Sequence, residues 1–593
     1  MATDTILHRL INNGRVRPNA PAYFVKSDNV WTPTSWHEYV TQVRQAAAAL
    51  IALGLEPGGG VCILGFNRPE WVIFNLASML AGGYAAGIYA SNSPPDVRYI
   101  IENSESSIIL LEDQDQWQKV LQVRDQIGGL KHVITMKGCY IDDPQVLDWE
   151  TFMHKGDQIG EELVEERIAG LRMDQLAALV YTSGTTGPPK GVMLSHHNLA
   201  WTADQGVRLF EVTPGDSLLS YLPLSHAAEQ MFTIHAAVTG GCQVYFAQYP
   251  PQKHLSDNLK EVTPTFVFGV PRVWERFEEG IKATLAKSAG MRTRIAEWAL
   301  RVGKRASTLK NVGEEPTGLL ALQYKLANQL VYSKVKEALG MSRARFCLTG
   351  AAPIATEIVE FFNCLDFPFL EIYGQTEVSG PTSINRPGAN KIGSVGQAWP
   401  GVQVRLADDG EILVKGPNVF MGYYKNPEAT ASDLVDGWLH TGDLGEFDEQ
   451  GYLTVIGRKK EIIITSGGLN ITPSNIEAAL MKLPLVSQAV CIGDKRRYIT
   501  AIVTLNAETA AKFAKDNSLE GQGLHAHPAI IEAVQKGIDE QVNTHLSRAE
   551  HVRDFRILSR DFTLEDGEIT PLLKIKRKIV YEHFKSEIES MYA

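Results

Sequence analysis

A strand that runs into a loop of hydroxyls, glycines and one lysine decides the fold: Leu179-Val180-Tyr181-Thr182-Ser183-Gly184-Thr185-Thr186-Gly187-Pro188-Pro189-Lys190-Gly191. The inner glycines permit close backbone approach, the hydroxyls can donate to phosphate oxygens, and Lys190 supplies positive charge. No Gly-Lys-Ser/Thr ends the loop, so it is not a Walker A loop. The loop predicts a polyphosphate site, although a surface turn rich in small residues explains such a loop equally well when it is taken alone.

Short apolar runs alternate with helix-like segments around this loop. They occupy residues 61–64, 107–111, 132–134 and 176–181. Such alternation is typical of parallel strands joined by crossover helices. The body of the chain is therefore predicted to be α/β with mostly parallel sheets.

The length of 593 residues is too great for one ordinary core, so several subdomains are expected. Residues 271–345 are helical and charge-rich and predict a helical insertion, whereas the short strands and turns of 402–457 predict a β-rich closing subdomain. The charged run Gly457-Arg458-Lys459-Lys460-Glu461 then marks a boundary. We expect a body over 1–457 and a small α+β domain over 458–593.

Composition excludes several classes of protein. A net charge of −11 makes nucleic acid an improbable partner. Six cysteines without a Cys-x-x-Cys pair argue against a disulfide framework or a zinc knuckle and are expected to be reduced core thiols. Residues 71–95 carry no charge, but Gly82-Gly83 and Pro94-Pro95 divide them, so no transmembrane helix is expected. The N-terminus resembles no secretory signal, so a cytoplasmic location is expected.

The loop at 179–191 resembles the signature of the adenylate-forming superfamily, which comprises acyl-CoA synthetases, firefly luciferases and peptide-synthetase adenylation domains. Further motifs follow in the family's order across nearly the whole chain. The resemblance implies ATP, magnesium and coenzyme A as cofactor or co-substrates, and an enzyme-bound acyl-adenylate. It also implies that the nucleotide is bound by Thr182, Ser183, Gly184, Thr185, Thr186, Gly187 and Lys190.

Two motifs of the body resemble the family's acid pocket and its adenine site. Tyr221-Leu222-Pro223-Leu224-Ser225-His226 resembles the acid-pocket motif and implies a catalytic His226, and Gly350-Ala351-Ala352-Pro353 resembles the turn that contacts adenine. Taken alone, the first would more often be a buried structural histidine and the second an ordinary turn.

A third motif, Tyr373-Gly374-Gln375-Thr376-Glu377, resembles the family's central motif. The resemblance implies that the tyrosine stacks near adenine, that Thr376 meets the α-phosphate, and that Glu377 holds magnesium. When a carboxylate attacks phosphorus two anions meet, so the chemistry needs a cation and hydroxyl donors.

A fourth motif, Gly437-Trp438-Leu439-His440-Thr441-Gly442-Asp443, resembles the one whose aspartate accepts both ribose hydroxyls. Arg458 should add a contact to ribose or phosphate. The family's pivot corresponds to Lys460, about which the C-terminal domain is expected to turn.

The C-terminal part carries two further motifs. Thr465-Ser466-Gly467-Gly468-Leu469-Asn470-Ile471 resembles the loop that lines the coenzyme A passage, through Ser466, Gly467 and Gly468, and Ser474-Asn475-Ile476-Glu477 fits a capping box. Thr570-Pro571-Leu572-Leu573-Lys574-Ile575-Lys576-Arg577 resembles the catalytic-lysine motif. Leu573 replaces the glycine of many members, as it does in long-chain members. Lys574 is preferred over Lys576 as the residue that bridges the substrate carboxylate and the α-phosphate.

The substrate is inferred from separate segments. Residues 268–276, the helical insertion and 527–539 are similar to the long-chain and bubblegum-type acyl-CoA synthetases, which implies a long-chain fatty acid:CoA ligase. Gln375-Thr376 resembles the main long-chain group, so the subgroup stays open. Alternatives are an aryl- or medium-chain ligase, a luciferase-like oxygenase, or a non-catalytic acyl- or nucleotide-binding relative. Peripheral membrane association and a homodimer also stay open.

Overall fold

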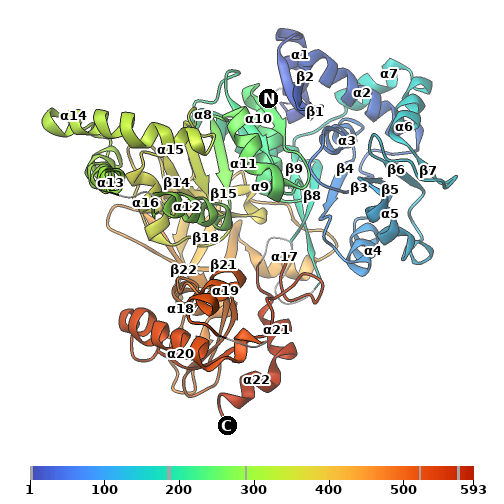
Figure 1. The fold of residues 1–593 in the computed structure, drawn as a ribbon. Coiled ribbons are helices and arrows are strands. Elements are labelled where there is room, and N and C mark those ends of the chain that lie inside the picture. Colours follow the sequence, from blue (N-terminus) through green and yellow to red (C-terminus); the bar gives the residue numbers. More distant parts are fainter. Residues whose placement is uncertain (1–3, 183–187, 287–289, 520–522, 571–573) are drawn as a thin grey trace.

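The computed structural model describes residues 4–182, 188–286, 290–519, 523–570 and 574–593. Figure 1 shows a large body, blue to yellow, above a smaller C-terminal domain, orange to red. The two parts are joined through the strands and short turns around residue 458. Two large sheets build most of the body, as the alternation of strands and helices predicts.

The first sheet has eight strands in the order β19-β9-β8-β4-β3-β5-β6-β7. Its inner pairs are parallel, whereas β9 runs antiparallel to β8 and to β19. The strands are β3 (Gly60–Leu64), β4 (Tyr84–Ile88), β5 (Ser106–Leu111), β6 (His132–Thr135), β7 (Val146–Leu147), β8 (Leu176–Thr182), β9 (Lys190–Ser195) and β19 (Gly422–Tyr423). The predicted phosphate loop links β8 to β9 in the sequence, and its residues 183–187 lie outside the described ranges.

The second sheet has nine strands in the order β16-β15-β14-β13-β12-β10-β11-β1-β2. Its central pairs from β14 to β1 are parallel, and the pairs at both edges are antiparallel. The strands are β1 (Pro21–Ser27), β2 (Val30–Ser35), β10 (Ser217–Ser220), β11 (Gln243–Phe246), β12 (Phe266–Gly269), β13 (Phe346–Thr349), β14 (Phe369–Gln375), β15 (Gly380–Ile384) and β16 (Gln397–Ala398).

Helices cover the faces of both sheets and bury their apolar residues. Helix α3 is almost wholly buried, which explains the uncharged stretch after Trp71 without a membrane span. The covering helices are α1 (Ile6–Val16), α2 (Trp36–Ala52), α3 (Pro69–Leu80), α4 (Pro94–Asn103), α5 (Gln114–Leu121), α6 (Trp149–Lys155), α7 (Glu161–Ala169), α8 (His196–Leu209), α9 (Ala227–Gln230), the π-helix Met231–Ala236, α10 (Ala237–Gly240), α11 (Pro251–Val262) and α16 (Thr356–Cys364). Among the residues that the structure describes, no helix combines the length and apolar character needed to cross a bilayer.

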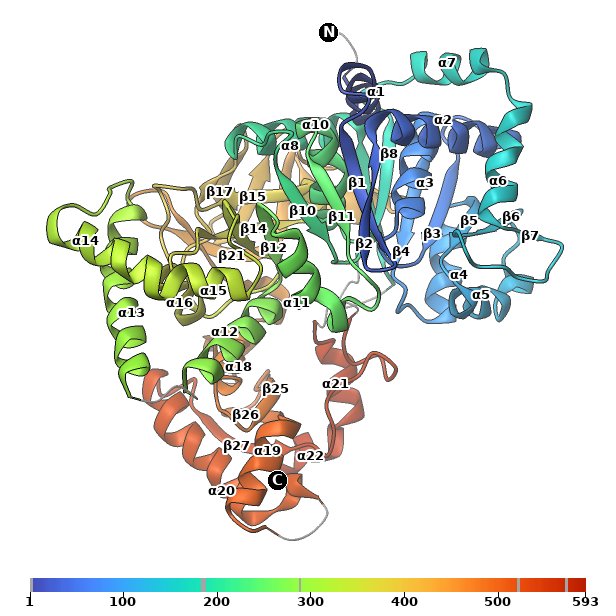
Figure 2. The same ribbon diagram turned by 45° about the horizontal axis from the view of Figure 1, so that its top comes forward.

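The segment predicted as a helical insertion forms an arm on one side of the body. It consists of α12 (Pro271–Ala286), α13 (Met291–Lys310), α14 (Gly318–Ala327), the π-helix Asn328–Tyr332 and α15 (Ser333–Ala338). In both views α14 lies at the outer edge of the molecule (Figures 1 and 2).

A five-stranded sheet closes the body. It contains β17 (Gln403–Leu406), β18 (Glu411–Lys415), β20 (Leu434–Val435), β21 (Trp438–Phe447) and β22 (Leu453–Arg458), and α17 (Pro427–Asp433) precedes β20. The antiparallel register of β21 and β22 places Asp443 opposite Arg458. Two residues that lie far apart in sequence are thus held side by side.

The C-terminal domain is α+β. It contains β23 (Ile463–Ile464), β24 (Asn470–Ile471), α18 (Pro473–Leu480), β25 (Val486–Ile492), β26 (Ile499–Leu505), α19 (Ala507–Asp516), α20 (Pro528–Gly537), the π-helix Ile538–Val542, β27 (Val552–Ile557), α21 (Arg577–His583) and α22 (Lys585–Ser590). Strands β25, β26 and β27 form its three-stranded sheet and carry its own apolar core.

The predicted capping box at Ser474 is wrong. Helix α18 starts at Pro473, with Thr472 as N-cap and without a side-chain cap, because proline favours the first helical position. Glu477 instead accepts from the Cys491 amide and forms an ion pair with Arg577. The Glu477 carboxylate therefore forms a tertiary ion pair and does not cap the helix.

Candidate active site

One continuous cavity of about 1760 Å³ lies between the body and the C-terminal domain and extends into the body. We call one part of its wall the polar side; it consists of Thr182, Lys190, Glu371, Tyr373, Gln375, Thr376, Glu377, Asp443, Arg458 and Lys574. We call the other part the apolar arm; it consists of Thr202, Ala203, Gly206, Phe210, Val212, Leu218, Met231, Phe232, Ala236, Ala237, Cys242, Phe266 and Phe268. His226 also lines the cavity.

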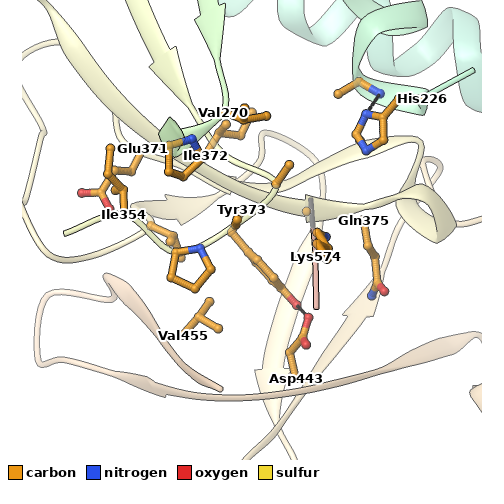
Figure 3. A pocket seen from close by; sticks show the side chains of 18 of the residues that line it. His226, Val270, Ile354, Glu371, Ile372, Tyr373, Gln375, Asp443, Val455 and Lys574 are labelled. Carbon is orange, nitrogen blue, oxygen red and sulfur yellow. Dashed lines mark hydrogen bonds between the residues drawn. The ribbon is translucent and has the colours of Figure 1, made fainter. Parts of the chain in front are cut away.

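Asp443 is the best-anchored group of the polar side. The Tyr373 hydroxyl donates to its carboxylate at 2.7 Å (Figure 3). Arg458 Nε lies 3.2 Å from its other oxygen. Burial raises the pKa of Asp443, while the charge of Arg458 opposes that shift. The arrangement presents a fixed carboxylate to the cavity, which suits a pair of vicinal hydroxyls.

At two positions of the predicted motifs, neighbouring backbone lies so close that only glycine fits. A Cβ on Gly374 would lie 1.7 Å from the Gly380 carbonyl oxygen, and one on Gly350 would lie 2.6 Å from that of Ile372. Gly350 thus lets its turn pack against β14, and the following residues Ala351 and Ala352 line the cavity beside Tyr373. The turn and the tyrosine together can enclose a flat ring.

Glu377 is the candidate metal ligand. Its carboxylate accepts from the Tyr423 hydroxyl at 2.9 Å, and burial raises its pKa. It forms no ion pair with another described residue, so a divalent cation beside it would fit, since buried carboxylates need a counter-charge. No cluster of three or more His, Cys, Asp or Glu within the described ranges could hold a metal by itself. Magnesium here would therefore rely on Glu377 together with phosphate oxygens.

Lys190 ends the phosphate loop and faces the same part of the cavity. Its amino group lies 3.4 Å from Asp433 and 4.3 Å from the centre of the Tyr423 ring. The Tyr423 hydroxyl oxygen also lies 3.0 Å from Asp433, so its single proton can be donated either to Asp433 or to Glu377. The lysine is thus held near Glu377 by groups that the motifs do not contain.

Lys574 extends from the C-terminal domain into the cavity, near Tyr373, Gln375 and Asp443 (Figure 3). Burial, and then the positive charge of Arg458, lowers its pKa. On the body side, burial and the charge of Lys574 lower the pKa of His226 to about 4. The His226 ring accepts from the Ala228 amide through Nδ1. It is therefore neutral near pH 7 and adds no charge to the mouth of the apolar arm.

The apolar arm is enclosed by α8, the π-helix Met231–Ala236, and strands β10 and β12. Phe232 and Phe268 stack at 4.9 Å between ring centroids on its wall. Its one unsatisfied polar atom among the described side chains is the buried Thr202 hydroxyl, which has no hydrogen-bond partner. The remainder is suited to an alkyl chain.

The predicted coenzyme A loop lies away from the cavity, whereas the predicted hinge residue lines it. Ser466, Gly467 and Gly468 are exposed and are not among the described residues that line the cavity. Lys460 lies at the cavity rim in the short turn after β22. Two contacts bridge the parts: Lys482 pairs with Glu357 at 2.8 Å, and Arg272 donates to the Ser487 carbonyl at 3.1 Å. In this arrangement of the two parts Lys574 lines the cavity.

Sequence reasoning missed three polar residues of this site. Tyr423 and Asp433 belong to no motif, and only the packing of β19 and α17, which they end, brings them to Lys190 and Glu377. Glu371 precedes the central motif by two residues. Burial raises its pKa to about 7, and among the described residues its carboxylate accepts one hydrogen bond, a long one from the Gly393 amide. The sequence offered one indication of this site residue, namely an acidic side chain in an otherwise apolar strand next to the central motif.

This fold and cavity define the adenylate-forming class of enzymes. The chain belongs to the family of AMP-binding enzymes: the model of the AMP-binding enzyme matches residues 11–424, and that of the AMP-binding enzyme C-terminal domain matches residues 460–593. The sequence-based α/β fold class and family resemblance are confirmed.

Named relatives match nearly the whole chain. Long-chain-fatty-acid–CoA ligase ACSBG2 of Xenopus laevis is 40% identical, covering 96% of this chain and 81% of the relative, and ACSBG1 of Homo sapiens is 35% identical, covering 96% and 82%. These names confirm the resemblance to bubblegum-type synthetases. Among solved structures, ATP-bound MatB from Rhodopseudomonas palustris has a TM-score of 0.68 at 23% identity, covering 98% and 99%. The AMP-bound A-PCP didomain of carboxylic acid reductase from Segniliparus rugosus has 0.72 at 20%, covering 100% and 82%.

Proposed function

We propose that the protein is an ATP-dependent, AMP-forming ligase that joins a long-chain fatty acid to coenzyme A. The observation that carries the proposal is that Lys574 lies in one cavity with both the polar side and the apolar arm. A nucleotide on the polar side and an alkyl chain in the arm would bring phosphate and carboxylate together at this lysine. The names of the full-length relatives support the same reaction.

On the polar side, Asp443 would accept the ribose hydroxyls, and Arg458 would hold the aspartate in place and contact ribose or phosphate. Adenine would lie between Tyr373 and the turn that contains Ala351. Glu371 faces this region as a buried acid, so its carboxyl can receive the exocyclic amine of adenine. The triphosphate would be held by Lys190, Thr182 and the loop at 183–187.

Thr376 and Glu377 would act at the α-phosphate. Magnesium, bound through Glu377 and phosphate oxygens, would supply positive charge where negative charge accumulates. The Thr376 hydroxyl would donate to a phosphate oxygen, and Gln375 would line the space beside it. These donors act in a partly buried site, where each is worth more than in bulk solvent.

In the first half-reaction an oxygen of the fatty acid carboxylate attacks the α-phosphorus. The bond from that phosphorus to the bridging oxygen breaks, and pyrophosphate leaves. Lys574 would bridge the two anions as they approach and so reduce their repulsion. His226, being neutral, would orient the carboxylate by hydrogen bonding without binding it as a counter-ion.

In the second half-reaction the coenzyme A thiolate attacks the acyl carbon, the thioester forms, and AMP leaves. We propose that the C-terminal domain turns about Lys460 so that Ser466, Gly467 and Gly468 line the path of the thiol.

Lys460→Pro should impair this step more than adenylation, because proline fixes φ and restricts the preceding residue. Wild-type rates in both half-reactions of the variant would place the pivot elsewhere.

The decisive experiment is a pyrophosphate-exchange assay with an acid panel from acetate and benzoate to long-chain fatty acids, followed by addition of coenzyme A. We expect exchange with long-chain acids, and acyl-CoA, AMP and pyrophosphate as products. ADP and phosphate would contradict the mechanism, and activity confined to acetate or benzoate would contradict the substrate class. Exchange without thioester formation would indicate a different acceptor, and no exchange a non-catalytic relative.

A further inference from the structure

Helix α14 exposes a row of leucines at the outer edge of the helical arm. Leu319, Leu322 and Leu326 of α14, and Leu330 of the π-helix that continues it, are 71%, 68%, 48% and 39% exposed. Their spacing of three and four residues places them on one face of the helix. We call them the leucine face.

The leucine face is distinct from the side of α14 that packs on the protein. Leu320 and Tyr324 lie against the core under the arm, and Ala327 and Val331 are buried there. The helix is therefore apolar on two sides, although one of them meets solvent. A contiguous apolar surface of this kind marks an interaction site more often than a lone exposed leucine does.

Positive charge surrounds the leucine face. Residues 291–338 contain nine lysines and arginines against four glutamates, in a chain whose net charge is −11. Lys325 and Lys334 are exposed beside the leucines, and Arg301 and Arg305 are exposed on the neighbouring α13. None of these four residues forms an ion pair with another residue of the described ranges.

We propose that the leucine face of α14 docks on an anionic lipid bilayer, with the surrounding lysines and arginines at the headgroup phosphates. An apolar helical face bordered by basic side chains is the pattern of a helix that lies in the membrane interface. A second copy of this chain fits the surface less well, because it would bring two basic borders together. The C-terminal domain lies on another side of the molecule and leaves α14 accessible (Figures 1 and 2).

Vesicle sedimentation of the full-length protein tests the proposal. We expect binding to phosphatidylcholine vesicles that contain phosphatidylglycerol, and at least about tenfold weaker binding to phosphatidylcholine alone, since each basic residue near an anionic surface adds affinity. The triple variant Leu319→Gln, Leu322→Gln, Leu326→Gln should bind the anionic vesicles at least about tenfold more weakly. Its adenylation of a water-soluble acid should be unchanged, because α14 contributes no residue to the cavity wall among the described residues.

The matched control removes three exposed apolar side chains elsewhere: Val16→Gln, Leu121→Gln and Ile531→Gln. It should bind vesicles as the wild type does. Lys325→Gln with Lys334→Gln should weaken binding only to anionic vesicles. Failure of the wild type to bind, or equal binding by the leucine variant, would overturn the proposal. A wild-type dimer that the leucine variant converts to a monomer would overturn it in favour of self-association.

Discussion

The polar side and the apolar arm of the cavity are built on different principles. Asp443, Arg458 and Tyr373 are held by hydrogen bonds and an ion pair of defined length, whereas the arm is a space left between α8, a π-helix and two strands. A hydrogen bond or close ion pair requires a short distance and a defined orientation, while an alkyl chain requires only a dry volume of suitable length. Substitutions on the polar side should therefore change the rate of the chemistry, and those in the arm should change which acid is used.

The largest effect is expected from Lys574→Ala. Adenylation should slow by roughly a hundred- to thousandfold, the usual cost of losing one preorganised donor, while thioester formation from supplied acyl-adenylate should be nearly unchanged. Pyrophosphate exchange and the transfer half-reaction would be measured on the same preparation. Lys576→Ala is the matched control; a larger loss from it would move the bridging role to Lys576, and equal loss in both half-reactions would reject the separation of roles.

Gly206→Leu should instead fill part of the apolar arm. An added Cβ would meet Trp399 at an ordinary 3.6 Å, so the helix can accept a side chain that then fills the arm. Displacing about three methylenes at ~0.8 kcal/mol each should lower kcat/KM for the longest acids about fiftyfold and spare short ones. Gly206→Ala, which hardly extends into the arm, is the control. An equal loss at every chain length would mean that the alkyl chain lies elsewhere.

Asp443→Asn should weaken nucleotide binding without changing the acid preference. A hydrogen bond to a charged group is worth about 1.5–3 kcal/mol, so the KM for ATP should rise about tenfold or more. The ranking of acids in the panel should stay as in the wild type. If the variant altered chain-length preference, the two parts of the cavity would not be independent.

Two buried histidines make the dryness of the core between α8 and the π-helix Met231–Ala236 testable through pH. Burial lowers the pKa of His196 to about 4 and that of His235 to about 3, against about 6.5 in an unfolded chain. Below pH 6.5 these histidines therefore bind protons in the unfolded chain but not in the folded protein. The free energy of unfolding should fall with pH down to about 4, by up to about 1.4 kcal/mol per unit for each histidine.

Urea unfolding at several pH values would measure this slope, and His235→Leu should reduce it. His197 is the control position, because its side chain is exposed; His197→Leu should leave the slope unchanged. A slope unaffected by His235→Leu would show that this ring is hydrated in the folded protein.

The smallest effect is expected from Thr202→Val. The change keeps the shape of the side chain and removes a buried hydroxyl without a partner, which should stabilise the protein by about 1 kcal/mol and raise affinity for long acids a few-fold. Thr202→Ser retains the hydroxyl and is the control. Lower affinity in Thr202→Val would indicate that the hydroxyl meets a polar group of the substrate.

The sequence predicted the α/β body and the order of its motifs because both depend on local patterns. Phosphate and carboxylate chemistry needs particular side chains on short loops at strand ends, so Tyr373, Glu377 and Asp443 stand out before any contact is known. The structure brings these residues to one cavity with Lys574. Their roles, like the loop at 183–187, remain predictions for the experiments above.

The tertiary structure alone decided what depends on residues far apart in the chain. Glu477 pairs with Arg577 and not with a local cap, because an ion pair and a backbone amide satisfy its carboxylate across the domain. Tyr423 and Asp433 reach Lys190 only through the packing of β19 and α17. The apolar arm carries no motif, since any combination of side chains that leaves the same volume would serve. A charge has to be a particular residue at a particular place, whereas an empty space is a property of everything packed around it.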